Sequence, residues 1–325
     1  MLNKFNNVKR RFLPLPESSL QGLENEPNIT DFEIKKELGS DEYGNIYLVK
    51  HKETHAEYAI KAIDKRDKEN DIERPYFKKG IAALYNIRHP NIVNLFGHFE
   101  DNNYCYIIME YLKKGNLYNL IPPDKKKRIK LNICALIIKN VISAVYFLHN
   151  MNPPIIHLNI KPENVLLAEE LVAKLGDFAW NTYIQEDETR KAIRSTPSDI
   201  PPETLLEKRY DESSDIWYIG TLLFELVTAT VPFIGDNSDI IKDNILNLKF
   251  NWPKDINNDA KDLIQKILKL NPKERLSLKD MLKHPFITQY FPDAEKCLIK
   301  PGEGVKYKPF IISKDDPKSW KPEKI

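Results

Sequence analysis

The sequence predicts an α+β fold of two lobes, in which a small antiparallel sheet with one main helix is followed by a larger helical lobe. Two observations support this prediction. Between residues 32 and 110 the apolar runs are short, β-branched and aromatic, and turn-like clusters such as GSDEYG separate them, as expected for strands. After residue 115 the apolar runs lengthen and take helical periodicity. We expect one domain over 32–290, with a small lobe at 32–110, a large lobe at 113–290, and tails at 1–31 and 291–325.

The composition is that of a globular protein with a sizeable core. Of the 325 residues, 42% are hydrophobic, and 49 basic residues nearly balance 47 acidic ones. This balance argues against nucleic acid as the main partner. The three cysteines have no short spacing, so they form neither a zinc motif nor a disulfide framework and fit a reducing compartment. The apolar runs indicate no signal peptide and no membrane span, which predicts an intracellular protein.

Before the small lobe, the first thirty residues are polar and interrupted by three prolines, which predicts a mobile tail.

In the small lobe, one helix-like stretch is expected among the strands. The helix-like stretch is PYFKKGIAALYNI, where Pro75 suits a first helical turn. The strand segments are FEIKKEL, GNIYLVKH, EYAIKAI, IVNLFGHFE and YCYIIMEY.

In the large lobe, two long segments are apolar nearly all round, as buried helices are. They are LNICALIIKNVISAVYFLHN and SDIWYIGTLLFELVTA. The segment NNDAKDLIQKILKL is amphipathic and starts at an Asn or Asp cap. KHPFITQYF is expected as the closing helix. The basic run DKKKRIK is favoured as a solvated loop before a helix, with a nuclear-import patch or a docking surface as alternatives.

Five short motifs follow one another in a definite order along the chain. LGSDEYGNI is a glycine-bearing turn between two strands, and YAIK places Lys61 on a strand. HLNIKPEN is a polar loop after a buried helix, and GDFAW and IPPE follow it. Each motif alone is weak, but the ordered set resembles the protein-kinase signature over roughly 32–290. Within that fold, IRHPNIVNLFGHF, GDFAW, PPE and HPFI are most similar to the Aurora family of Ser/Thr kinases.

The resemblance implies a site for ATP and Mg²⁺ that works by positioning and by charge neutralisation. Lys61 would hold the α- and β-phosphates, and Lys161 would lie near the γ-phosphate. The metal positions would be Asn164 and Asp177. Adenine would be enclosed by apolar side chains and received by the backbone of a hinge. The nucleotide positions implied are Gly39, Gly44, Ile46, Ala59, Lys61, Met109, Glu110, Leu112 and Leu166.

Several chemical positions depart from the family pattern. Asn159 stands where the family aspartate accepts the substrate hydroxyl proton, and an amide oxygen is a very weak base. General-base assistance is typically worth ~10²–10⁴-fold in rate. Leu158 replaces the arginine that would bind an activation-loop phosphate, and Gly80 replaces the glutamate that would pair with Lys61. Asp41 replaces the middle glycine of the loop and would place negative charge near the ATP phosphates.

The activation segment departs in the same direction. Ala179 replaces the last residue of the DFG triplet and should stiffen that turn. Lys191 and Ala192 stand where an Aurora-like kinase would present its activating threonines, which matches the missing arginine at Leu158. The remaining candidate phosphosites are Thr189, Ser195 and Thr196, of which Thr196 also matches a structural position of the family.

Three functional hypotheses follow. Because His157, Asp215 and the Glu203–Arg275 pair match scaffold positions of the family, the leading one is a pseudokinase acting as a scaffold or allosteric partner, with weak ATP or ADP binding. The second is a low-activity Ser/Thr kinase, since phosphoryl transfer depends little on the base. The third is an interaction module with an empty cleft. Analogy with Aurora kinases implies protein partners at the spindle or centrosome, in the cytoplasm or nucleus.

Overall fold

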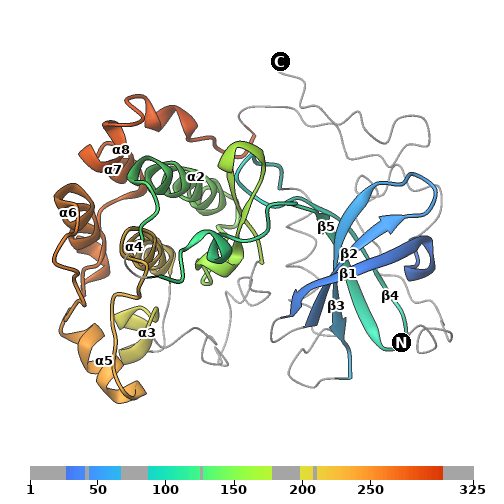
Figure 1. Ribbon diagram of the computed structural model, residues 1–325, viewed down its shortest axis with the longest axis horizontal. Coiled ribbons are helices and arrows are strands. Elements are labelled where there is room, and N and C mark those ends of the chain that lie inside the picture. Colours follow the sequence, from blue (N-terminus) through green and yellow to red (C-terminus); the bar gives the residue numbers. More distant parts are fainter. Residues whose placement is uncertain are drawn as a thin grey trace. The chain divides into compact units, whose positions relative to one another are not determined.

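The chain folds into two compact units that are described separately below. The computed structural model describes residues 27–40, 44–66, 87–124, 127–177, 198–207 and 211–302 (Figure 1). Unit 1 takes the described residues up to Arg88 and Val93–Tyr111, and unit 2 takes His89–Ile92 and the described residues from Leu112 onward. Unit 1 is a β-sheet and unit 2 is mainly helical, so the predicted α+β class is confirmed.

Unit 1 contains a five-stranded antiparallel sheet in the order β1-β2-β3-β5-β4. All five expected strands are present. The fourth is shorter than its apolar run, because Ile92 bridges to Leu175 of unit 2 instead of joining the sheet. The expected helix at PYFKKGIAALYNI lies outside the described residues. The strands are β1 (Phe32–Ser40), β2 (Gly44–His51), β3 (Glu57–Asp64), β4 (Leu95–Glu100) and β5 (Tyr104–Glu110).

The sheet buries an aromatic cluster on one of its faces. Phe99 stacks between Phe32, at a centroid distance of 6.2 Å, and Tyr106, at 4.7 Å. Successive strand residues point to opposite faces, so the residues that alternate with this cluster form the other face. We call the first face the cluster face; its core consists of Ile29, Phe32, Val49, Tyr58, Ile60, Phe99, Tyr106 and Ile108.

Ordered structure extends on both sides of the domain limits that the sequence suggests. A 3₁₀ turn (η3, Ile29–Asp31) precedes β1, and a capping box between Asn28 and Asp31 closes it. Its Ile29 belongs to the core of the cluster face because that residue is apolar and 9% exposed. At the other end a 3₁₀ turn (η9, Ala294–Cys297) packs on unit 2, where Ser143 Oγ donates to the Cys297 carbonyl at 2.6 Å.

Unit 2 is built around two buried helices, α2 (Leu131–His149) and α4 (Glu212–Thr228), which lie side by side (Figure 1). Helix α2 is long and apolar enough to cross a membrane by length and composition, but 72% of its apolar window is buried, as in a core helix. The expected cap of α6 is confirmed, since Asn257 Oδ1 accepts from Ala260 N–H. The other helices are α3 (Pro202–Glu207), α5 (Ser238–Leu246), α6 (Asn258–Ile267), α7 (Leu278–Leu282) and α8 (Pro285–Thr288).

Candidate nucleotide and phosphotransfer site

A buried carboxylate holds the loop that follows α2. Asp215, on α4, is fully buried and accepts hydrogen bonds from His157 N–H at 2.9 Å and Leu158 N–H at 2.7 Å. His149 Nε2, at the end of α2, lies 2.8 Å from the same carboxylate. Asp215, which the sequence indicates as a scaffold position, therefore anchors this loop within unit 2. The contact with His149 was not anticipated, because nothing in the local sequence pairs these two residues.

The tautomer of His157 follows from its two neighbours. Its Nε2 lies 3.0 Å from the carbonyl of Gly176, which can only accept, so Nε2 carries the proton. Its Nδ1 accepts from Asn159 N–H at 3.3 Å. Burial lowers the pKa of His157, against the opposing effect of Asp215, which agrees with a neutral ring. A neutral, doubly bonded imidazole fixes the start of the loop.

Further hydrogen bonds bring Asn159, Asn164 and Asp177 next to one another in space. Asn164, in the 3₁₀ turn η5 (Pro162–Asn164), donates its Nδ2 to the Asn159 carbonyl at 2.8 Å. Gly176 N–H donates to the Asn164 carbonyl at 2.9 Å, so the residue after it, Asp177, adjoins Asn164. Asp177 has a φ of 49°, a left-handed conformation that is unusual for aspartate and is typical of functional sites.

These residues fit a magnesium ion that is shared with a nucleotide. Since the Asn164 amide group donates through Nδ2, its Oδ1 is the atom left for a cation. Asp177 supplies a carboxylate, and Mg²⁺ prefers one or two such oxygens plus substrate phosphates to a cage made only of protein. The described residues contain no group of three or more His, Cys, Asp or Glu suited to holding a metal ion. A bound Mg²⁺ would neutralise phosphate charge at this position.

Leu158 contributes packing where the resemblance would place a cation. Its side chain is 1% exposed and its φ is 59°. A left-handed conformation costs a non-glycine residue roughly 1–2 kcal/mol, which the hydrogen bond from its N–H to Asp215 helps to offset. A buried leucine cannot bind a phosphate. The loop therefore keeps its backbone geometry while losing the charge.

An acidic group that sequence reasoning did not anticipate lies near Lys161; it consists of Asp199, Glu163 and Glu225. Burial raises the pKa of Asp199 to about 6, with Glu163 adding to the effect and Lys161 opposing it. Burial likewise raises the pKa of Glu225 to about 7, and both Asp199 and Glu163 add to that rise. Glu225 interrupts the apolar run of α4, and that interruption was the available signal.

Except for Glu110, which pairs with Tyr58 of the cluster face, the nucleotide positions of unit 1 lie on the opposite face of the sheet. Ile46 pairs with Gly39 on one side and with Lys61 on the other, and Ala59 pairs with Met109. Directly paired residues share a face, so these residues line one surface of the sheet. Lys61 is only 1% exposed.

One of the two predicted loop glycines has a clear steric reason. A Cβ on Gly44 would lie 2.0 Å from the carbonyl oxygen of Ala62, so β2 can begin against β3 only with glycine there. No described atom lies within 4 Å of a Cβ on Gly39, which leaves that position without a packing reason. Asp41, between them, lies outside the described residues.

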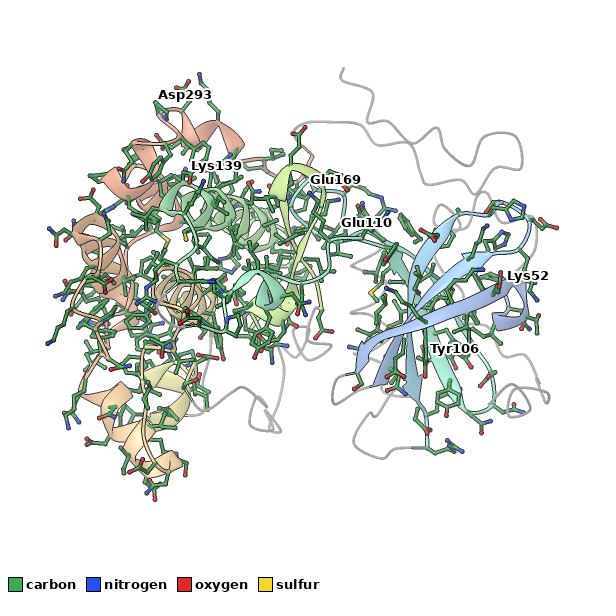
Figure 2. The ribbon with its side chains drawn as sticks, viewed as in Figure 1. Lys52, Tyr106, Glu110, Lys139, Glu169 and Asp293 are labelled. Atoms are coloured by element: carbon green, nitrogen blue, oxygen red, sulfur yellow. The ribbon has the colours of Figure 1, made fainter. Side chains whose placement is uncertain are left out.

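The expected hinge coincides with the junction of the two units. Tyr111 ends unit 1 and Leu112 begins unit 2. Glu110, labelled in Figure 2, accepts from Asn94 Nδ2 at 3.0 Å, so its carboxylate is engaged within unit 1. In unit 2, Leu166 on the short strand β6 (Val165–Leu167) bridges to Asn116, and β6 pairs with β7 (Ala173–Leu175).

Part of the expected site cannot be placed. Gly80, Ala179 and the candidate phosphosites fall outside the described residues, as do Lys191 and Ala192. The roles of the nucleotide positions therefore stay predictions.

The predicted ion pair between Glu203, on α3, and Arg275 is confirmed. Arg275 Nη1 and Nη2 donate to the two carboxylate oxygens of Glu203 at 2.8 and 2.5 Å. The guanidinium also donates to the carbonyls of Ser213 and Lys269 and lies over the ring of Trp217 at 5.2 Å. This pair ties the segment after the activation loop to the helical core.

A β-sheet unit, a helical unit and an aspartate-anchored polar loop define the class of protein. The family described as protein kinase domain matches residues 32–287, and the chain belongs to this family. Its relatives include the Aurora kinase of Yarrowia lipolytica, 35% identical over 281 residues, which are 86% of this chain and 74% of that protein. Aurora kinase C of Mus musculus is 33% identical over 262 residues, 81% of this chain and 93% of that protein. The Aurora kinase of Saccharomyces cerevisiae is 33% identical over 267 residues, which are 82% of this chain and 71% of that protein. The chain is thus an Aurora-like member of the protein kinase family.

Proposed function

We propose that this chain is a pseudokinase: an Aurora-like kinase domain that acts as a scaffold or allosteric partner. The observation that carries the proposal is the amide at Asn159. The backbone of Asn159 is held by His157 Nδ1 and by Asn164 Nδ2, so the side chain extends from a properly anchored loop. The side-chain amide of Asn159 can orient a substrate hydroxyl but cannot accept its proton. A loss of ~10²–10⁴-fold in rate is expected from this change alone.

Weak binding of ATP or ADP belongs to the same proposal. Lys61 is retained for the phosphates, and Asn164 and Asp177 offer oxygens to Mg²⁺. Against this stand Asp41, which adds negative charge near the phosphates, and Gly80, which removes the expected partner of Lys61. Retained ligands favour binding, and the two departures favour low affinity.

A phosphotransfer assay tests the catalytic part. Wild type, Asn159→Asp and Asn159→Asp/Gly80→Glu are incubated with Mg²⁺, labelled ATP and a generic Ser/Thr protein substrate. The proposal expects wild type to equal a Lys61→Ala control and the revertants to exceed it. Asn251→Asp, an exposed change of the same kind outside the site, controls for added charge. Wild-type transfer above the Lys61→Ala level would refute the pseudokinase proposal.

A thermal-shift titration tests the nucleotide part. A ligand that binds only the folded chain raises the free energy of unfolding, by about 2.7 kcal/mol when the ligand concentration is a hundred times Kd. The melting temperature rises accordingly. We expect ATP with Mg²⁺ to raise it, and Asn164→Ala to remove the dependence on Mg²⁺. No shift with ATP, with or without Mg²⁺, would favour the interaction module with an empty cleft.

The second candidate is a low-activity protein Ser/Thr kinase. The relationship to Aurora kinases and the retained Lys61, Lys161, Asn164 and Asp177 favour it. Phosphoryl transfer passes through a loose transition state, so positioning and metal ions supply most of the catalysis. Slow transfer that is lost in Lys61→Ala but hardly changed by Asn159→Asp would support this candidate.

We propose protein partners for either function. By analogy with Aurora kinases they belong to the spindle or centrosome, which would place the chain in the cytoplasm, the nucleus or both. Residues 1–31 and 291–325 are proposed as segments flanking the kinase-like domain, apart from the short ordered pieces described above. Co-purification with tagged spindle proteins, against an unrelated kinase domain, tests the partner class.

A further inference from the structure

The cluster face of unit 1 has a pocket that the proposed function does not use. Its enclosed volume is small, about 60 Å³, and it opens to solvent at its mouth. Three tyrosines line it, and Tyr106 is labelled in Figure 2. It lies on the sheet face opposite Ile46, Ala59 and Lys61, so it is separate from the nucleotide positions of unit 1. The other lining residues are Ile29, Ile34, Asn45, Val49, Ile60 and Ala62, in addition to Tyr47, Tyr104 and Tyr106.

The pocket has a buried apolar floor and an accessible mouth. Val49, Ile60 and Tyr106 are each at most 2% exposed and form the floor. Ile34, on β1, is 41% exposed at the mouth. A solvent-exposed isoleucine beside a preformed aromatic hollow is favourable for binding an apolar ligand.

Local contacts hold the tyrosine rings in place. Tyr106 Oη donates to Asp101 Oδ2 at 2.9 Å, which fixes the ring in the floor. Arg66 lies over the ring of Tyr104 at 5.6 Å, and the Tyr104 and Tyr106 centroids are 6.0 Å apart. The pocket therefore loses little side-chain entropy on binding.

The N-terminal segment of the chain joins the described structure at the wall of this pocket. Ile29 lines the pocket, and the turn that carries it is held by the Asn28–Asp31 capping box. Lys52, labelled in Figure 2, donates through Nζ to the Thr30 carbonyl at 2.6 Å and adds a further tie. Whatever precedes Pro27 is thus tethered beside the pocket by a fixed anchor.

We propose that the pocket binds the chain's own segment Phe12–Pro16, of sequence FLPLP. Prolines at every second position favour the polyproline II conformation, which aromatic-lined grooves bind at low entropic cost. Phe12, Leu13 and Leu15 supply apolar groups that match the tyrosine and aliphatic lining. The tail would cover the exposed Ile34 and the mouth around it.

Reach and tethering support this occupant. Residues 17–26 separate the segment from Pro27 and can span at most about 35 Å. A five-stranded sheet is only about 19 Å wide at roughly 4.8 Å per strand spacing. A tether of this length gives an effective concentration in the millimolar range, so even weak intrinsic binding would give a measurable bound fraction.

Photo-cross-linking in the full chain tests the proposal. The photoreactive amino acid p-benzoyl-phenylalanine replaces Phe12, the protein is irradiated at low micromolar concentration, and cross-linked peptides are identified by mass spectrometry. We expect intramolecular products joining residue 12 to the β1, β2 or β5 peptides that contain Ile34, Tyr47 or Tyr104. Products mainly with unit 2, or mainly covalent dimers, would overturn the proposal, the latter in favour of a second copy as occupant.

A matched pair of surface variants supplies the control. Ile34→Asp places a charge at the mouth and should lower the cross-link yield about tenfold, the effect of a tenfold weaker affinity. Leu38→Asp makes the same change on the same strand at 40% exposure, but Leu38 does not line the pocket, so the yield should stay within about twofold. Equal melting temperatures of the two variants verify folding. Equal cross-link yields would refute the proposal, as would an unchanged yield in Leu13→Ser/Leu15→Ser.

Discussion

Replacing Arg275 by methionine should destabilise unit 2 severely. The guanidinium makes two hydrogen bonds to Glu203, one to the Ser213 carbonyl and one to the Lys269 carbonyl. The side chain of Arg275 is fully buried, and that of Glu203 is 13% exposed. Methionine preserves most of the volume over Trp217, so the loss is mainly electrostatic.

The magnitude follows from what is left behind. Without Arg275, the Glu203 carboxylate keeps, among the described residues, only the hydrogen bond from Ser214 Oγ at 3.1 Å and must stay largely desolvated or pull α3 toward water. Breaking a buried pair from one side typically costs 3–5 kcal/mol, so we expect about 4 kcal/mol here. Replacing both partners, as Glu203→Met/Arg275→Met, removes the stranded charge and should recover about half of that loss.

Urea unfolding followed by tryptophan fluorescence measures the effect, with Trp217 as a local reporter beneath the guanidinium. Arg128→Met is the matched control, because Arg128 pairs with Asp255 at 3.9 Å on the surface and such pairs contribute at most about 1 kcal/mol. A loss below about 1 kcal/mol for Arg275→Met would refute the reasoning, and so would a double variant that is less stable than the single one.

Three further predictions concern unit 2. The folded-state pKa values of Asp199 and Glu225, about 6 and about 7, lie above those of free carboxyls, so protonation of these groups favours folding at low pH. The free energy of unfolding should therefore fall by on the order of 2 kcal/mol per group as the pH rises from about 4 to 7. The pH dependence of the urea midpoint should flatten in Asp199→Asn/Glu225→Gln, and an equally steep profile in this variant would contradict the assignment. In Gly220→Ala the new Cβ would lie 2.6 Å from Leu268 Cδ2, so we expect a loss of about 1–3 kcal/mol in melting experiments, whereas a gain would show that the α4–α6 contact yields easily. In Asp215→Asn an amide group replaces one acceptor of the catalytic-loop N–H groups, which should cost about 1–3 kcal/mol and speed their hydrogen exchange roughly tenfold or more, an effect absent if the loop is held elsewhere.

The sequence predicted the elements well because they depend on local periodicity. Strand β2 has the bounds of the run GNIYLVKH, and the all-round apolar character of α2 matches its burial. The limits of the domain were harder to predict. Ile29 and the turn at Ala294–Cys297 join the packed structure through contacts with residues distant in the sequence, which a composition change cannot reveal.

For the site, the sequence determined the chemistry that each position offers. The identities of Lys61, Asn159, Asn164 and Asp177 follow from motif order alone, and with them the proposal that the base is lost. The tertiary structure decided which groups meet. Asp215 gathers donors from two segments 57 to 66 residues away.

The acidic group near Lys161 and the tyrosine pocket on the cluster face were likewise decided only by the fold. The pKa values of Asp199 and Glu225 rise because packing removes water from carboxylates that lie far apart in the chain. The pocket forms because the register of four strands brings Tyr47, Ala62 and Tyr106 to one face. Side-chain chemistry is a property of each residue, whereas desolvation and register depend on long-range contacts, and those exist only once the chain is folded.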